Sequence, residues 1–259
     1  MKLPLDQLDA FTDRVFGGNP AAVVTLERWL DDATLQAIAA ENNLAETAFV
    51  IPRPTVCPLR WFTPTLEIDL CGHATLAAAH VLFERHFPDA VRLAFETHSG
   101  LLGVDRDGDV LSLDFPSRPG DPVALDEPTA RALGVRCIEA RKARDLMVVL
   151  ESQAAVLAFV PDHAVIAALD AFALIVTAPG DDVDFVSRFF APGAGVPEDP
   201  VTGSAHCTLI PYWAARLGKS RLTARQLSAR GGELACELRG DRVKIGGKVA
   251  PYLAGVIDI

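Results

Sequence analysis

Hydrophobic and polar residues alternate along parts of this chain with the two-residue period of strands, and elsewhere follow helical spacing. Residues 3–10 and 21–26 alternate, which is typical of half-buried strands. Residues 31–41 open with Asp31 at the position of a helix cap, and residues 47–51 form a short apolar run typical of a buried strand. We therefore expect a mixed fold of strands and helices.

Two longer helices are predicted over residues 73–85 and 204–217, and both are apolar nearly all round. A helix without a polar face is surrounded by protein on every side. Pro211 lies inside the second helix, where it removes one backbone donor and predicts a kink. We expect each helix to form the centre of a curled sheet.

The two halves of the chain repeat one pattern. RWFTP at residues 60–64 followed by CGHA at 71–74 corresponds to RFFAP at 188–192 followed by TGSA at 202–205. Two predicted hairpins follow in the same order, at residues 99–113 and 231–245, each with Gly-Asp in its turn. Two copies of one supersecondary plan are indicated, with a ligand cleft between them.

The predicted halves are residues 1–118 and 119–259, because the segment 116–128 is rich in proline and aspartate and is typical of a connection. The last strand, at about residues 252–259, is expected to cross back to the first half.

Composition narrows the possible functions. Half of the residues are hydrophobic, the formal net charge is −10, and the basic residues are scattered, which argues against nucleic acid as a partner. No apolar run approaches the ~18 residues of a membrane span and no secretory signal is evident, so we expect a cytoplasmic protein that does not contact membranes.

Cofactor and metal signatures are lacking. The five cysteines are widely spaced without a C-x-x-C pair, and the histidines show no metal-binding spacing. Neither a dinucleotide-binding nor a P-loop glycine motif occurs. We therefore expect neither a cofactor nor a bound metal.

Both apolar helices begin with glycine and small or polar residues, at Gly72 and Gly203. A helix N-terminus presents unpaired N–H groups and a positive dipole end, which suit an anion. These starts predict a small anionic substrate.

Four segments identify a family: FGGNPAAVV (16–24), NNLAETAFV (42–50), LCGHATLAAAH (70–80) and EDPVTGSAH (198–206). In this order they resemble the signatures of the phenazine-biosynthesis PhzF-like family. The resemblance implies an α+β fold of the diaminopimelate epimerase type, with two pseudo-symmetric halves, each a curled, mostly antiparallel sheet around a central buried helix. It also implies a homodimer.

The resemblance also implies the site. Glu46 matches the family's acid/base, and His73, Asp199 and Ser204 match three further catalytic positions. Expected substrate-binding residues are Asn19, Gly72, Ala74, Thr202 and Gly203. The implied activity is a cofactor-independent isomerase that shifts a proton on a small carboxylic acid, similar to trans-2,3-dihydro-3-hydroxyanthranilate isomerase. Pocket-lining residues outside the motifs decide which acid is the substrate and whether phenazine synthesis is involved.

Chemistry supports these roles, since moving a proton on carbon requires a base that returns it to another atom. His73 and Asp199 are suited to hydrogen-bond the substrate's polar groups, and Ser204 to hold its carboxylate with the helix N–H groups.

Three alternatives remain. An epimerase or racemase of the same fold pairs two cysteines, but the repeat places Cys71 opposite Thr202, whose hydroxyl is a far weaker acid than a thiol. We expect Cys71 to be a packing residue, although its position at a helix start can lower a thiol pKa. A Cys71–His73 hydrolase is disfavoured because residues two apart on a helix do not face each other. The third alternative is a non-catalytic protein that binds small acids.

Overall fold

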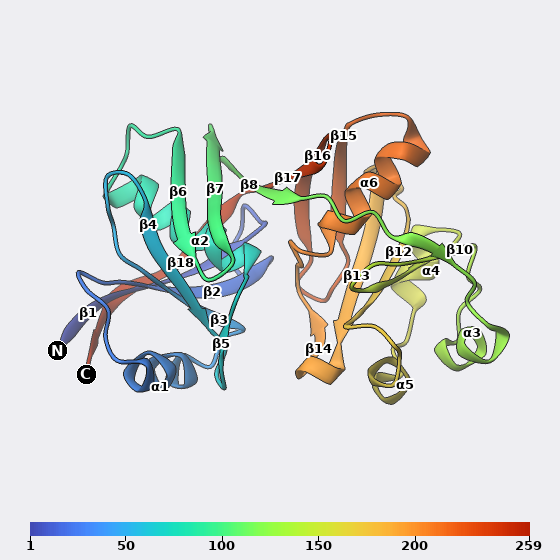
Figure 1. The fold of residues 1–259 in the computed structure, drawn as a ribbon, viewed down its shortest axis with the longest axis horizontal. Coiled ribbons are helices and arrows are strands. Elements are labelled where there is room, and N and C mark those ends of the chain that lie inside the picture. Colours follow the sequence, from blue (N-terminus) through green and yellow to red (C-terminus); the bar gives the residue numbers. More distant parts are fainter. The chain divides into compact units, whose positions relative to one another are not determined.

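The computed structural model describes residues 1–259 and divides the chain into two units. The first unit comprises Met1–Asp114 and Gly246–Ile259, and the second comprises Phe115–Ile245. Each unit mixes strands with a few helices (Figure 1).

The strands of the first unit are β1 (Lys2–Ala10), β2 (Asn19–Thr25), β3 (Glu46–Val50), β4 (Cys57–Phe62), β5 (Glu67–Ile68), β6 (Arg92–Thr97), β7 (Gly100–Asp107), β8 (Val110–Pro116) and β18 (Val249–Asp258). Its helices are α1 (Asp32–Asn42) and α2 (Gly72–Arg85). β1 pairs with β2 on one side and with the returning last strand β18 on the other, so both termini lie at one edge of this unit (Figure 1).

Most pairings in the first unit are antiparallel, but β2–β3 and β4–β6 are parallel. A parallel pair needs a crossover connection, and α1 and α2 supply the two crossovers. α1 begins where the sequence predicts, with the Asp31 side chain accepting a hydrogen bond from the Thr34 N–H at 2.9 Å. α2 is buried over most of its length and packs against β1, β2 and β3, as expected of a central helix.

The strands of the second unit are β9 (Asp121–Val123), β10 (Glu139–Lys142), β11 (Leu146–Val149), β12 (Leu174–Pro179), β13 (Phe185–Ala191), β14 (Val196–Asp199), β15 (Arg221–Gln226), β16 (Gly232–Arg239) and β17 (Arg242–Gly247). Its helices are α3 (Glu127–Leu133), α4 (Gln153–Ala158), α5 (His163–Ala167), the 3₁₀ turn η1 (Pro192–Ala194) and α6 (His206–Leu217). Parallel pairs again number two, β11–β12 and β13–β15.

The central helix of the second unit, α6, packs against β15 and β16, and its Trp213 ring stacks on Phe185. Its start differs from the sequence expectation. The helix begins at His206, not at residue 204, because residues 203–205 form a turn in which the His206 and Cys207 N–H groups donate to Gly203 and Ser204. α6 continues through Pro211 without a break.

The internal repeat has a structural counterpart in one ion pair per unit. Arg60 binds Glu67 through Nε and Nη2, each at 2.6 Å, and Arg188 binds Glu198 in the same way at 2.8 and 3.0 Å. Each guanidinium also lies over the phenylalanine ring two residues further along the chain, at 5.1 and 4.9 Å. The conserved geometry within the chain supports two copies of one plan.

None of the helices combines the length and the hydrophobicity that crossing a membrane requires.

Candidate active site

Three elements of the first unit bring the candidate acid/base residues together. Glu46 is the first residue of β3, His73 lies in the first turn of α2, and Asn19 begins β2. Because β2 and β3 are parallel neighbours and α2 packs on both, their N-terminal ends meet at the start of the helix. The predicted residues Gly72 and Ala74 flank His73 there.

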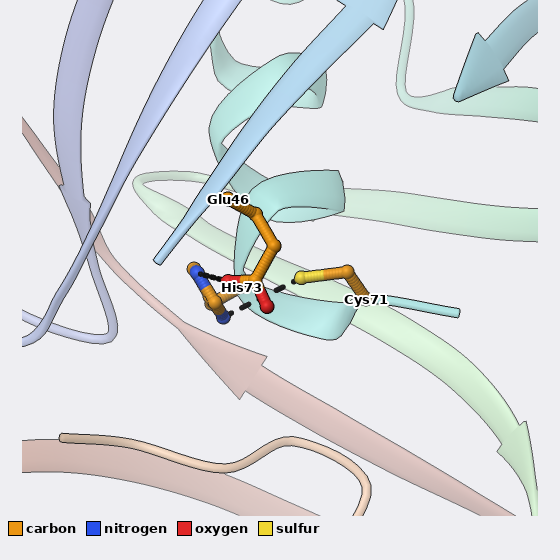
Figure 2. A group of neighbouring side chains, drawn as sticks. All are labelled: Glu46, Cys71 and His73. Atoms are coloured by element: carbon orange, nitrogen blue, oxygen red, sulfur yellow. Dashed lines mark hydrogen bonds and ion pairs between the residues drawn. The ribbon is translucent and has the colours of Figure 1, made fainter. Parts of the chain in front are cut away.

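The His73 imidazole lies between an acid and a thiol (Figure 2). Its Nε2 atom is 2.9 Å from Oε2 of Glu46, and its Nδ1 atom is 3.5 Å from Sγ of Cys71. The amide Nδ2 of Asn19 lies 3.2 Å from the same Nδ1 atom. The Glu46–His73 contact is at ion-pair distance without the alignment of a hydrogen bond.

The position of Cys71 overturns one sequence argument. Cys71 precedes α2 with extended backbone angles (φ −139°, ψ 118°), so helical spacing does not separate it from His73. The hydroxyl of Thr75, which lies one helical turn after Cys71, donates to the Cys71 carbonyl oxygen. The statement that Cys71 and His73 cannot face each other is therefore wrong.

Burial sets the electrostatics of this group. The His73 side chain is 7% exposed and that of Glu46 is 17% exposed. Burial opposes the charged imidazolium, but the negative charge of Glu46 at ion-pair distance outweighs it and raises the pKa of His73 above its usual value. Burial first, and the Glu46 charge second, raise the pKa of the Cys71 thiol, so the helix start does not activate it.

The same three side chains have the donor atoms of a metal site, and these atoms lie within 4.8 Å of one another. The thiol and the carboxylate, however, contact opposite nitrogens of one ring. A metal ion binds a histidine through one nitrogen, so the arrangement suits proton transfer better than coordination.

In the second unit, Asp199 and Thr202 form a hydrogen-bonded group with Gln226. Sequence reasoning did not identify Gln226. The Thr202 hydroxyl donates to Oδ2 of Asp199 at 2.5 Å. Gln226 accepts from the Thr202 N–H at 2.8 Å and donates to the Asp199 carbonyl oxygen at 2.7 Å. This fully buried glutamine therefore fixes the Asp199–Thr202 loop.

His206 has a structural role beside this loop. It is fully buried, and its Nδ1 lies 2.8 Å from the Thr202 carbonyl oxygen. Burial lowers the pKa of His206 to about 4, so the ring is neutral and Nδ1–H donates to that oxygen.

Ser204 follows Thr202 and Gly203 in the turn before α6, and its Oγ is 3.4 Å from Nη2 of Arg144. Arg144 is a second residue that the motifs did not indicate. Gln226 could have been found from sequence, because Leu222, Ala224 and Gln226 share the inward face of β15 by alternation. Arg144 has no such periodic signal.

The structure therefore groups Glu46, His73 and Asn19 within the first unit. Within the second unit it groups Asp199 with Thr202 and places Ser204 beside Arg144.

The two similar units, each with a central helix, have the type of fold found in isomerases and epimerases. The phenazine biosynthesis-like protein family (PhzC-PhzF) matches residues 8–255, and the chain belongs to this family. It is 51% identical over 259 residues to an "uncharacterized isomerase" of Pseudomonas aeruginosa, with all of both chains covered. The family resemblance and the expectation of an isomerase are confirmed at this level.

Solved structures agree. The crystal structure of a phenazine biosynthesis protein of the PhzF family from Enterococcus faecalis matches with a TM-score of 0.98 and 46% identity, with all of both chains covered. A hydroxyproline epimerase from Agrobacterium vitis matches with a TM-score of 0.64 at 10% identity, covering 99% of this chain and 92% of that one, which shows the fold alone. The predicted epimerase type of fold is thereby confirmed.

Proposed function

We propose that this chain is a cofactor-independent isomerase that shifts a proton on a small carboxylic acid, with Glu46 as the acid/base. The observation that carries the proposal is the 2.9 Å approach of Glu46 Oε2 to His73 Nε2 in a site where both side chains are mostly buried. Both atoms lack a well-aligned hydrogen bond. Buried polar atoms with unmet hydrogen bonding are unusual in native structures, and a catalytic role is one explanation for them.

The chemistry is balanced within one substrate. The Glu46 carboxylate takes a proton as one C–H bond breaks, the electron pair moves along the conjugated system, and the same proton forms a new C–H bond elsewhere. His73, whose pKa is raised by the neighbouring Glu46 carboxylate, presents a positive charge at ion-pair distance from Glu46. No external oxidant, reductant or nucleophile is needed.

The remaining predicted residues have roles in binding. Asp199, held by Thr202 and Gln226, is suited to accept a hydrogen bond from an amino or hydroxyl substituent. Ser204 is suited to bind the carboxylate. By family resemblance the reaction is similar to that of trans-2,3-dihydro-3-hydroxyanthranilate isomerase, with an amino-acid epimerase of the same fold as the alternative.

The homodimer and the cytoplasmic location indicated by the sequence remain predictions. Light scattering after size-exclusion chromatography tests the first, and cell fractionation tests the second.

The test is proton NMR of the protein in D₂O with trans-2,3-dihydro-3-hydroxyanthranilate, related amino-cyclohexadienoic acids, and the two enantiomers of proline and hydroxyproline. Deuterium entering a ring carbon with movement of a double bond supports the isomerase. Exchange only at the α-carbon, with inversion, supports the epimerase. Absence of exchange in every acid, while the folded protein binds them, contradicts both and supports a binding role.

A further inference from the structure

Arg144 is held in one orientation beside Ser204. Its Nε and Nη2 atoms donate to the two oxygens of Asp145 at 2.9 and 3.1 Å, and the Asp145 side chain is only 3% exposed. The guanidinium also lies 4.4 Å over the ring of Phe172. A guanidinium fixed on two sides loses little entropy when it binds a further group, and the Ser204 hydroxyl lies at its edge, 3.4 Å from Nη2.

Arg118 follows β8, and its backbone contacts the first turn of α6. Its backbone N–H donates to the carbonyl oxygen of Cys207, in the first turn of α6, at 2.8 Å. The Arg118 side chain is half-buried, and its guanidinium makes neither an ion pair nor a hydrogen bond. A partly buried guanidinium without a partner is uncommon, because five N–H donors are left to solvent alone.

The charges of both guanidiniums act on the thiol of Cys207. Burial raises the pKa of Cys207 to about 11, and the charges of Arg118 and Arg144 oppose this increase, whereas Asp145 adds to it. Cys207 follows Ser204 by three residues. Arg144 therefore reaches Ser204 through its side chain, Arg118 reaches the first turn of α6 through its backbone, and Asp145 pairs with Arg144.

We propose that Arg118 and Arg144, with the Ser204 hydroxyl in the turn before α6, form the subsite that binds the acidic group of the substrate. The arginines are specificity residues: they select a carboxylate and reject the corresponding neutral amide. A planar guanidinium matches a carboxylate through paired N–H donors, and the charge-assisted bonds are about twice as strong as neutral ones. The proposal rests on the proposed function, whose substrate is an acid, and names the groups that recognise that acid.

The experiment measures binding by NMR of ¹⁵N-labelled full-length protein, following the Ser204 and His206 amide signals. The probes are acetate, malonate and 3-hydroxyanthranilate, with 2-amino-3-hydroxybenzamide as the neutral counterpart of the third. R118Q is the decisive variant, because the Arg118 side chain has no partner to lose. R144Q is informative if it folds, since it leaves buried Asp145 unpaired. R136Q, at an exposed arginine of the same unit, is the matched control.

The proposal predicts that at least one carboxylate shifts the Ser204 amide in wild type and in R136Q, and that R118Q weakens this binding by about tenfold or more. The neutral amide is expected to bind weakly to wild type, R118Q and R136Q. Equal carboxylate affinity in R118Q and R136Q, equal affinity for acid and amide in wild type, or no response to any carboxylate would each overturn it.

Binding and catalysis are separated by E46Q, which is expected to bind the carboxylate as wild type does. If the arginines control binding but wild type exchanges no proton in any acid, the proposed function fails and the subsite stands. If exchange occurs but R118Q binds like R136Q, the subsite fails and the isomerase stands.

Discussion

Nε2 of His73 and Oε2 of Glu46 lie 2.9 Å apart, and the two side chains are 7% and 17% exposed. Removing one partner of such a buried pair leaves the other charge without compensation, which typically costs more than the pair contributes. The pair also couples protonation to folding, because the pKa of His73 is raised well above its usual value.

The His73→Gln variant is expected to be less stable than wild type by about 3 kcal/mol at pH 6, the low end of the cost of breaking a buried ion pair. The folded state holds the His73 proton more tightly than the unfolded state, so the contribution is full below the unfolded pKa of about 6.5. This stabilising contribution is lost as the pH rises through the raised pKa of His73 in the folded state. Urea unfolding at pH 6, 7.5 and 9 measures the difference.

The control for that series is His86→Gln, at an exposed histidine just beyond the end of α2. The stability of His86→Gln is expected to differ from that of wild type by close to zero at every pH. A His73→Gln deficit that grows as pH rises would contradict the direction of the pKa shift.

Cys71 is expected to be dispensable for proton transfer. The thiol is buried and its raised pKa keeps it protonated, so it is a poor nucleophile despite its contact with His73. Cys71→Ala should retain isomerase activity within about threefold and lose roughly 1 kcal/mol of stability from the small cavity. A thiol-specific reagent should modify half-buried Cys137 before Cys71. Rapid inactivation through Cys71, or loss of turnover in Cys71→Ala, would favour the thiol hydrolase.

Gln226 is expected to be needed for stability and for the position of Asp199. Gln226→Ala leaves the buried Thr202 N–H without its acceptor, and each such orphaned group costs roughly 1–3 kcal/mol. Gln153→Ala, which removes one exposed bond to the Asp181 N–H, is the control and should change stability by less than about 0.5 kcal/mol. Thermal unfolding compares them. Equal stability of the two variants would show that Gln226 does not fix the loop.

The regular elements could be predicted because their patterns are local. Alternation indicated β1 and β2, and the Asp31 cap indicated α1. The repeat indicated two related units, each with a central apolar helix. The start of α6 was missed because residues 203–205 form a turn with its own bonds to the His206 and Cys207 N–H groups, which the apolar pattern does not distinguish from a helix.

The site could be predicted only in part. Glu46 and His73 came from motif resemblance, since nothing in their spacing places the start of β3 beside the start of α2. Cys71 was misplaced because helical spacing was applied to a residue outside the helix. Arg118 and Arg144 carry no periodic signal, and the contacts of Arg144 with Ser204 and of Arg118 with Cys207 depend on how the chain folds back.

The account's central claim is that Glu46 moves the proton, and the most direct measurement compares deuterium incorporation from D₂O in wild type, Glu46→Gln and Glu41→Gln. Glu41 is exposed near the end of α1 and loses the same charge without touching the site. We predict that Glu41→Gln matches wild type, whereas Glu46→Gln is slower by about 10²–10⁴-fold while remaining folded. Exchange at the wild-type rate in folded Glu46→Gln would contradict the account.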